Sequence, residues 1–519
     1  MRFLHLVVLI FTALLLGCEK TYDSYDLTTT ESCGITVQYD GSSIRFCSKD
    51  ASDSTIQLLR SQDEFIWQAM NLYYFYQSEI NVLSDNRFSD YESLYDYLNS
   101  FGSSEELFYE SLLSTADRFS WIVDDYVALE NSLQGITTSF GYNFRLLRES
   151  EGSDDLFGYV EYVVEGGPAD NAGLIRGDIF NKVNGNQLTS DNYNSLLFKT
   201  NSYELTLAAL QDNTIVSGDQ KVNLTAVQLI QDPIFLDKTF DLNGQKVAYL
   251  VYNQFVNNNE AHRRLNEVFG RFKNEGISDL ILDLRYNPGG SLTTTRLLAS
   301  LIYGNANPNS MFGNIIYNDK LSPYFNSPLR FFESLPVVNS AGDTTSEEPI
   351  HKLEDLTRVF ILTSGSTASA SELLIVGLNP FMEVTTIGTT TVGKNVGSTI
   401  LYDSKASLFL KNENADISDK HAYVIQPIIS KLANSEGFSN YENGLEPDVI
   451  IDEKNFLNDL KPLGDVEEPL LAYVIAIIKG TGRNTNQNQI GKRFKYTDPH
   501  KMKVQKIVID QEYIPKINK

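Results

Sequence analysis

The stretch RVFILTSGSTASASELLIVGLNPFMEVTTIGTTTVGK, residues 358–394, joins three apolar or β-branched segments to a run of small hydroxyl residues and closes on a single lysine. Residues 359–363 and 384–387 have the pattern of buried strands, and residues 369–378 that of an apolar helix. The stretch therefore predicts a strand-helix-strand crossover in a parallel sheet. Its polar turn then lies at the carboxyl end of a strand, where such sheets bind ligands.

The turn SGSTASASE contains a candidate nucleophile. Its small residues allow a substrate backbone to approach a helix N-terminus closely. A serine hydroxyl needs a base to take its proton at neutral pH. No histidine lies between His351 and His421, and Lys394 is the basic side chain that follows Arg358 in the stretch. Burial among uncharged neighbours would lower the pKa of the Lys394 amine, so the stretch predicts a serine-lysine variant of the hydrolase triad.

The same residues resemble the signature of the carboxyl-terminal processing peptidases, also called tail-specific proteases. In that family a small-residue run of the type S-A-S-A-S-E precedes a T-x-G-K segment. The counterparts here are TASASE, residues 367–372, and TVGK, residues 391–394. The resemblance makes Ser369 the nucleophile and Lys394 the base, and their separation of 25 residues equals the family spacing.

Two further positions are candidates for supporting this dyad. Many family members carry a glutamine four residues after the lysine, which helps to orient the amine, whereas Ser398 stands here. A serine still accepts a hydrogen bond but reaches less far. Glu372, one helical turn past Ser369, either contributes in its place or stabilises the helix dipole as a first-turn acid. The sequence leaves both roles open.

A second turn precedes a helix at YNPGGS, residues 286–291, between a predicted strand at 277–285 and a predicted helix at 292–302. Two glycines in such a place can form a backbone nest that receives an anion. DLRYNPGG resembles the family's D-L-R-x-N-x-G-G. The resemblance makes the backbone N–H groups of Gly290 and Ala370 the oxyanion donors, with Gly289 in support. A GG turn alone is usually structural, and the combination with the serine and the lysine favours the catalytic role.

Composition limits the possible classes of protein. The 519 residues are 42% hydrophobic and 11% aromatic, which suffices for two to four globular domains. A net charge of −25 argues against nucleic acid or anionic lipid as a main partner. Five histidines scattered along the chain and no Cys/His cluster lead us to expect no metal and no cofactor.

The N-terminus has the pattern of an export signal. Residues 1–17 form a signal peptide by their basic start and short apolar run, and the ending LLGC resembles a bacterial lipobox, which implies lipidation of Cys18. An ordinary signal peptide with an incidental cysteine is the alternative. The resemblance implies an exported protein, lipid-anchored in the bacterial cell envelope on the periplasmic face or outer surface, that touches the membrane through this anchor only.

Residues 18–53 would form a tether with a hairpin around Asp40 and Gly41. Cys33 and Cys47 bracket that hairpin. In an oxidising compartment these two cysteines could form a disulfide across the hairpin. The alternative is two free thiols. Neither version carries catalysis.

Two domains precede the predicted protease core. Residues 54–131 predict a helical domain whose aromatic residues form its core, and DRFSWIVDD, residues 117–125, is assigned no chemistry. Residues 132–232 predict a PDZ-like β-rich domain, because GGPADNAGLIRGDIFNKVNG resembles a PDZ segment. PDZ domains add a peptide end as a strand to a sheet edge, and the carboxylate-binding loop would lie at Phe140, Gly141 and Tyr142, just after Ser139. A PDZ-like fold kept only for structure remains the alternative.

Strands alternate with helices in residues 233–483, which predicts a mostly parallel α/β layer, and the resemblance implies that this region is a protease core of the ClpP/crotonase-like type. Residues 484–519 predict a polar tail. The core contains a long polar insertion at 303–353, which lines a substrate groove or is decoration, and further strand patterns at 398–410 and 422–432. NGLEPDVIID, residues 443–452, resembles the family's closing segment.

The sequence thus predicts a multidomain α+β serine endopeptidase. It would hydrolyse exported polypeptides near carboxyl termini, holding them by their extended carboxyl-terminal segments. One rival is a peptide-binding lipoprotein of the same fold whose catalysis has lapsed. The other is a peptidase like the tricorn relatives, with His262 or His421 as the base. The oligomeric state, the cleavage-site preference and the physiological substrate stay open.

Overall fold

The computed structural model describes residues 56–481 except 134–135, 308, 324, 326, 340–343 and 412–415, together with five short strands in the terminal segments. The predicted signal peptide and Cys18, Cys33 and Cys47 lie outside the described residues. Strands β2 (Ile35–Tyr39) and β3 (Ser42–Phe46) pair antiparallel, which confirms the two strands of the predicted hairpin; β1 (Leu27–Thr29) pairs with β2. Within the described part of the chain, no helix is both long and apolar enough to cross a bilayer.

The N-terminal domain is helical, as predicted, and its aromatic residues form a core. The main helices are α1 (Ser61–Tyr73) and α2 (Tyr91–Asn99), followed by the short α3 (Ser104–Glu106) and, after β4 (Trp121–Val123), by α4 (Tyr126–Leu133). Phe65 and Trp67 are buried in one apolar cluster with Leu265 and Leu298 of the protease core. The two regions therefore fold around a shared core.

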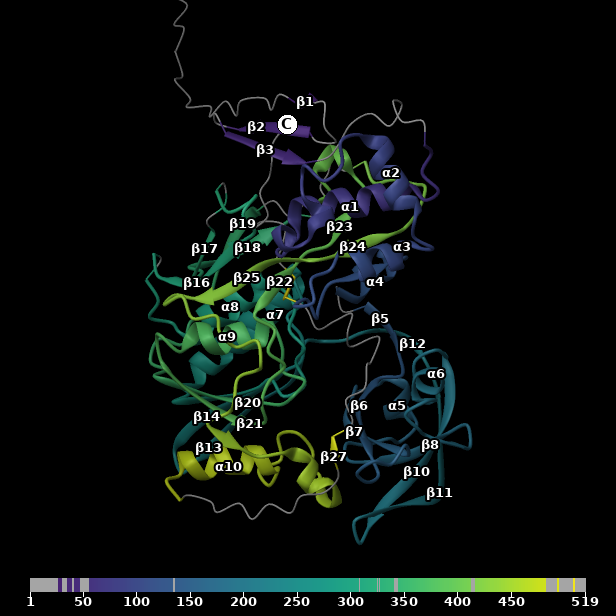
Figure 1. Ribbon diagram of the computed structural model, residues 1–519. Coiled ribbons are helices and arrows are strands. Elements are labelled where there is room, and N and C mark those ends of the chain that lie inside the picture. Colours follow the sequence, from purple (N-terminus) through teal and green to yellow (C-terminus); the bar gives the residue numbers. More distant parts are fainter. Residues whose placement is uncertain are drawn as a thin grey trace, which may run out of the picture.

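The PDZ-like region is a twisted antiparallel sheet in the order β11-β10-β8-β7-β6. Its strands are β6 (Tyr142–Arg148), β7 (Leu156–Val163), β8 (Ile179–Val183), β10 (Ser202–Gln211) and β11 (Thr214–Thr225), with helices α5 (Pro168–Asn171) and α6 (Tyr193–Leu197). A ribbon of β5 (Ile136–Ser139) and β12 (Val227–Ile230) joins it to the rest of the molecule (Figure 1). The edge strand β6 carries one further antiparallel partner, β27 (Lys492–Arg493), from the C-terminal segment.

The predicted protease core is built on a sheet in the order β13-β14-β15-β20-β21-β26. The strands are β13 (Ile234–Leu242), β14 (Gln245–Tyr252), β15 (Asp279–Asp283), β20 (Arg358–Thr363), β21 (Glu383–Gly388) and β26 (Val449–Ile450), and all pairs after β13 are parallel. The helices of this layer are α7 (Asn259–Glu275), α8 (Leu292–Ile302) and α9 (Ala370–Leu378), with α10 (Pro469–Ile478) packed on the apolar cluster of the other sheet face. The predicted crossover β20-α9-β21 is confirmed, and so is the α+β fold class.

A second sheet, in the order β17-β16-β25-β22-β28, covers the helices. It contains β16 (Met311–Tyr317), β17 (Ser327–Arg330), β22 (Val396–Ser398), β25 (Ile428–Asn434) and β28 (Ile507–Val508). The polar insertion supplies β16, β17 and the hairpin of β18 (Ser334–Val338) and β19 (Thr344–Pro349). Asn318, just after β16, donates to the carbonyls of Leu72 and Tyr74 at 3.0 Å, so the insertion also fastens the helical domain.

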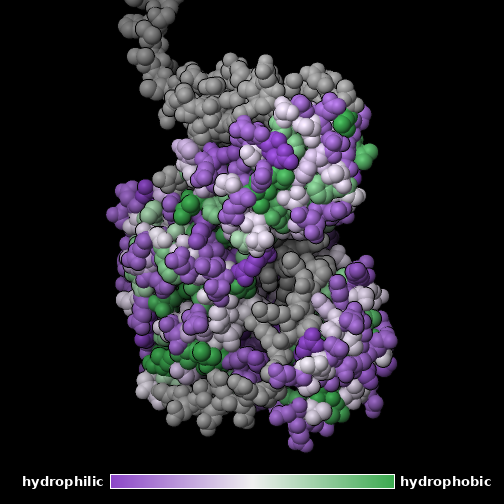
Figure 2. Space-filling model, in the orientation of Figure 1, coloured by the Kyte–Doolittle hydropathy of each residue, from purple (hydrophilic) through white to green (hydrophobic). Residues whose placement is uncertain are grey.

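The predicted strand at 398–410 is wrong beyond its first residues. The chain forms β22, then the two-residue β23 (Leu401–Tyr402), and then a turn in which Leu408 and Phe409 have positive φ. Strand β24 (Val424–Gln426) lies between β23 and β4. The face of the molecule in Figure 2 is mainly hydrophilic, with apolar residues in small separate patches, as the large negative charge leads us to expect.

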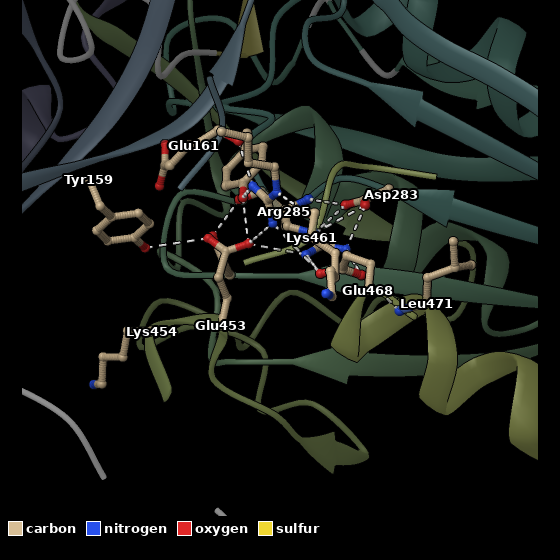
Figure 3. Close-up of polar contacts among 12 residues, drawn as sticks. Tyr159, Glu161, Asp283, Arg285, Glu453, Lys454, Lys461, Glu468 and Leu471 are labelled. Atoms are coloured by element: carbon tan, nitrogen blue, oxygen red, sulfur yellow. Dashed lines mark hydrogen bonds and ion pairs between the residues drawn. The ribbon is translucent and has the colours of Figure 1, made fainter. Parts of the chain in front are cut away.

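A buried network of charges joins three parts of the chain at the end of β15 (Figure 3). Arg285 pairs with Asp283 at 2.8 Å, with Glu468 at 2.6 Å and with Glu453 at 3.1 Å. Arg176 of the PDZ-like domain reaches Glu453 at 2.7 Å. Burial opposes the ionisation of Glu453, yet the charges of Arg176 and Arg285 lower its pKa to about 2. Through Glu453, ion pairs therefore link the PDZ-like domain to the segment that leads from β15 into the Gly289–Gly290 turn.

We expect Arg176→Met to lower the free energy of unfolding by about 3 kcal/mol, because it leaves the buried Glu453 with one cation fewer. The matched control is Arg148→Met in the same domain. Its ion pair with Asp154 measures 3.5 Å, and the side chain of Asp154 is 80% exposed. Exposed pairs contribute about 1 kcal/mol or less. Calorimetric melting at neutral pH measures both variants, and equal shifts of Tm would contradict the structural role of the network.

Candidate active site

Ser369 lies between β20 and α9 in a strained backbone conformation. Its φ of 65° is positive for a residue with a side chain, and it occupies the N-cap of α9. Such conformations cost about 1–3 kcal/mol and persist where surrounding contacts impose them. Here the Thr367 hydroxyl donates to the Leu284 carbonyl at 2.8 Å, and the Ala368 N–H donates to the Asn287 carbonyl at 3.1 Å. The turn is thus held by the end of β15.

The side chain of Ser369 is fully buried. Its Oγ has no hydrogen-bond partner within the described part of the chain. A buried hydroxyl in this state costs free energy unless another group completes its bonding. The predicted nucleophile is therefore enclosed by protein and hydrogen-bonded to none of the described residues.

The Gly289–Gly290 turn packs directly against this serine. A Cβ atom at Gly289 would lie 2.8 Å from Ser369 Cβ and 3.0 Å from the Ala370 nitrogen, and the φ of Gly289 is 105°. Only glycine fits there. The Gly289 N–H donates to Asn287 Oδ1 at 2.8 Å, and Asn287 Nδ2 donates to the Tyr252 carbonyl at 2.7 Å. The structure thus brings together the turn, Ser369 and Ala370, as the sequence predicts.

Glu372 connects the serine segment to the lysine segment. Its fully buried carboxylate accepts from the N–H groups of Ser369 at 2.7 Å, Gly393 at 2.7 Å and Lys394 at 2.8 Å, and from the Thr391 hydroxyl. Burial raises the pKa of Glu372, against the opposing effect of these hydrogen bonds. Glu372 therefore accepts from the N-cap residue of α9 and joins the two segments.

Lys394 follows β21 in the loop that leads to β22 and is fully buried. Burial lowers the pKa of its amine to about 7, although the charges of Asp117 and Glu372 act in the opposite direction. Its Nζ lies 5.3 Å from the centre of the Phe119 ring. Arg118 donates to the Gly393 carbonyl at 2.9 Å. The segment 117–125, assigned no chemistry from the sequence, therefore forms one wall of the lysine site.

Ser398, the position four residues after the lysine, is also fully buried and lies in β22. Its hydroxyl accepts from Gln426 Nε2 at 3.2 Å. Gln426 comes from β24, 28 residues further along the chain. Sequence reasoning missed Gln426, because no local pattern marks a glutamine whose partner is set only by the packing of two sheets.

The predicted carboxylate-binding loop of the PDZ-like domain is built from internal contacts. The Gly141 N–H donates to Ser139 Oγ at 3.0 Å, and the Phe140 carbonyl accepts from the Ala169 N–H at 3.0 Å. The hydroxyl of Tyr142 lies 2.7 Å from that of Tyr203. These three predicted residues lie together at the start of the edge strand β6.

The two histidines named as alternative bases have other partners. His262 Nε2 lies 2.8 Å from the Thr294 hydroxyl, and burial lowers its pKa to about 4. His421 Nε2 lies 3.1 Å from Asp403 Oδ2. Neither is hydrogen-bonded to Ser369 Oγ. Across the described ranges, no group of three His, Cys, Asp or Glu side chains is arranged to hold a metal ion.

Comparison with protein families finds three matches along the chain. The model of peptidase family S41 matches residues 246–451, the PDZ domain model matches 159–197, and the model of the peptidase S41 N-terminal domain matches 61–121. They fall in the core, the PDZ-like region and the helical domain respectively.

Curated relatives are distant. A probable CtpA-like serine protease of Staphylococcus aureus (strain bovine RF122 / ET3-1) is 23% identical over 297 residues, 56% of this chain and 50% of that protein. A carboxy-terminal-processing protease of Bartonella bacilliformis is 24% identical over 237 residues, 45% of this chain and 48% of that protein. The chain thus spans about half the length of the curated relatives it matches.

Among solved structures, the chain is similar to a putative S41 protease from Bacteroides fragilis NCTC 9343, with a TM-score of 0.60 and 24% identity. The match covers 81% of this chain and 98% of the other. At this level of identity the similarity shows a shared fold.

We expect Glu372→Gln to lower the free energy of unfolding by about 1–3 kcal/mol, because an amide NH₂ replaces an oxygen that accepts from backbone N–H groups. Hydrogen exchange should rise at the amides of Ser369, Gly393 and Lys394. Glu383→Gln, at the exposed start of β21, is the matched control and should change stability by less than about 0.5 kcal/mol. If both variants melt and exchange alike, Glu372 does not join the two segments.

Proposed function

We propose, on the premise that the chain belongs to peptidase family S41, that it is a serine endopeptidase acting through Ser369 and Lys394. The three family matches confirm the predicted membership. The observation that carries the proposal is the Glu372 carboxylate, which bonds the backbone of both residues and so holds the two segments at one place. The burial of Lys394 beside them supports its role as a base.

In the proposed mechanism Ser369 Oγ attacks the scissile carbonyl while Lys394 Nζ takes the hydroxyl proton. The lysine later gives this proton to the leaving amine, and water then hydrolyses the acyl-enzyme. The backbone N–H groups of Gly290 and Ala370 would hold the oxyanion. The packing of Gly289 against Ser369 and the position of Ala370 at the N-terminus of α9 support this assignment. One such donor contributes about 3–4 kcal/mol to the barrier in comparable enzymes.

The lowered pKa of Lys394 decides whether this base can work at neutral pH. An ordinary lysine with a pKa near 10.4 is neutral in about one molecule in 2,500 at pH 7. A pKa of about 7 makes about half of the amines neutral. Burial therefore supplies the active form without any histidine.

We propose that the substrates are polypeptides held by their extended carboxyl-terminal segments. In the PDZ-like domain β6 is the outermost of the domain's own strands, and β27 from the C-terminal segment pairs antiparallel with its end at Leu147 and Arg148. That pairing supports strand addition to β6 as the binding mode. Export and anchoring in the cell envelope through lipidated Cys18 remain part of the proposal and rest on the sequence alone.

The test uses the soluble chain from Thr21 onward on an unfolded protein with an apolar carboxyl terminus. We expect Ser369→Ala and Lys394→Ala to lower kcat/KM by more than about 10³-fold, since members of a catalytic unit are lost together. Lys454→Ala, a partly exposed lysine, is the control and should keep full activity. Cleavage that survives in Lys394→Ala would favour a histidine base. Binding of the tail without cleavage by the wild type would favour the lapsed binding protein.

The pH dependence of kcat/KM provides a second test. We expect it to rise through about pH 7 as Lys394 loses its proton. An ordinary histidine titrates in the same range, so this rise, the acidic limb of the pH profile, does not by itself distinguish a lysine base from a histidine base. Asp117→Asn does, because the Asp117 charge raises the pKa of Lys394, and its removal should move the limb to lower pH.

Asp403→Asn is the matched control, since it removes the carboxylate next to His421 instead. We expect this variant to leave the limb in place. A limb that follows Asp403 and ignores Asp117 would contradict the lysine base.

A further inference from the structure

Gln426 is a buried amide whose side-chain oxygen accepts no hydrogen bond from the described residues. Its side chain is fully buried at the end of β24, and its Nε2 donates to the Ser398 hydroxyl at 3.2 Å. Its Oε1 has no hydrogen-bond partner among the described residues. Leaving a buried acceptor in this state costs free energy, which calls for an explanation.

The packing places Gln426 between two segments that both belong to the lysine site. On one side is Ser398, four residues after Lys394 along the chain. On the other side β24 pairs with β4, with Gln426 opposite Trp121. Phe119, two residues before Trp121, lies against the lysine amine. The Ser120 hydroxyl, between them, accepts from the Ile428 N–H at 2.8 Å and fixes this register.

The proposed reaction creates a positive charge on Lys394, which is neutral in the form of the enzyme that reacts. When the Ser369 Oγ–carbon bond forms, the hydroxyl proton moves to Lys394 Nζ, and the neutral amine becomes an ammonium with three N–H donors. Inside a buried site this ammonium needs acceptors, and a charge-assisted hydrogen bond is about twice as strong as a neutral one. An acceptor that is unsatisfied before the proton transfer and satisfied after it stabilises the transition state selectively.

The charged groups that face Lys394 are already engaged. Asp117 accepts from the Tyr74 hydroxyl at 2.8 Å and from the N–H groups of Phe119 and Ser120. Glu372 accepts from four donors around the dyad. The Gln426 oxygen, by contrast, has its bonding capacity left.

We infer that Gln426 is a positioning residue for the Ser369–Lys394 pair: it orients the Ser398 hydroxyl and supplies an acceptor for the ammonium. This inference rests on the proposed function. A serine side chain reaches less far than a glutamine side chain, and the amide of Gln426 donates to the Ser398 hydroxyl from the neighbouring strand β24.

The test compares Gln426→Leu with Gln68→Leu. Gln68 in α1 is the matched control, because it is equally buried, its Nε2 donates to Glu64 at 2.8 Å and its Oε1 also has no partner among the described residues. We expect Gln426→Leu to lower kcat about 10- to 100-fold with KM unchanged, and to move the acidic limb of the pH profile to lower pH, because the ammonium loses an acceptor. Gln68→Leu should lose stability only.

A side-chain exchange provides the rescue. The double variant Ser398→Gln with Gln426→Ser returns an amide to the site from β22, and we expect it to recover kcat to within about threefold of the wild type and to restore the limb. This variant, together with the shortened amide in Gln426→Asn, also serves where Gln426→Leu fails to fold.

Three outcomes would overturn the inference. One is an unchanged kcat and limb in Gln426→Leu, the second is a loss no greater than in Gln68→Leu, and the third is failure of the exchange to recover activity. These differ from failure of the proposed function, in which the wild type does not cleave or Lys394→Ala remains active, and in which the role of Gln426 falls as well.

Discussion

The carboxylate of Glu372 fixes the geometry on which the site depends. Ser369 and Lys394 belong to separate connections of the sheet, and the backbone of each donates to the same buried carboxylate. Removing a carboxylate from water is costly, and hydrogen bonds from backbone N–H groups offset that cost only when all donors converge. The donors come from the first turn of α9 and from the TVGK segment. If either segment shifted, the buried Glu372 carboxylate would lose hydrogen bonds. Main-chain hydrogen bonds to one carboxylate therefore hold the backbones of Ser369 and Lys394 close together.

The strained turn at Ser369 is supported from the opposite direction by the end of β15. Gly289 allows the two turns to touch, and Asn287 bonds to both of them. The preceding Arg285 is held by a buried network that includes a carboxylate near α10 and reaches Arg176 of the PDZ-like domain (Figure 3). Buried ion pairs contribute little net stability, but the loss of one partner is strongly destabilising, so the network acts mainly to fix one arrangement. The turn that would hold the oxyanion thus shares its support with the domain that would hold the substrate.

The sequence predicted what is local or follows from one crossover. Residues 358–394 form a single β20-α9-β21 unit, so the pattern of strand, helix and strand fixes where Ser369 stands and where Lys394 must follow. It did not reveal Phe119 or Gln426, since each meets the lysine site only after the helical domain and the second sheet have packed on the core. The strand predicted at 398–410 failed for a related reason. Its apolar residues are buried as expected, but Phe409 reaches the core from a turn with positive φ and not from a strand. Apolar pattern reports burial more reliably than backbone conformation.

A lysine that works as a base needs two environments that oppose each other. Burial lowers the pKa of the amine, and the same burial raises the free energy of the ammonium that the proposed reaction forms. A site built from apolar residues alone would supply a good proton acceptor and then obstruct its protonation. In this protein Asp117 and Glu372 moderate the effect of burial, since their charges raise the pKa of Lys394 while desolvation lowers it to about 7. Both carboxylates are held in place by hydrogen bonds from backbone N–H groups. They can therefore stabilise the ammonium in the proposed mechanism without any rearrangement. In the proposed mechanism, the balance between a usable base and a stable conjugate acid therefore depends on Asp117 and Glu372 as well as on burial.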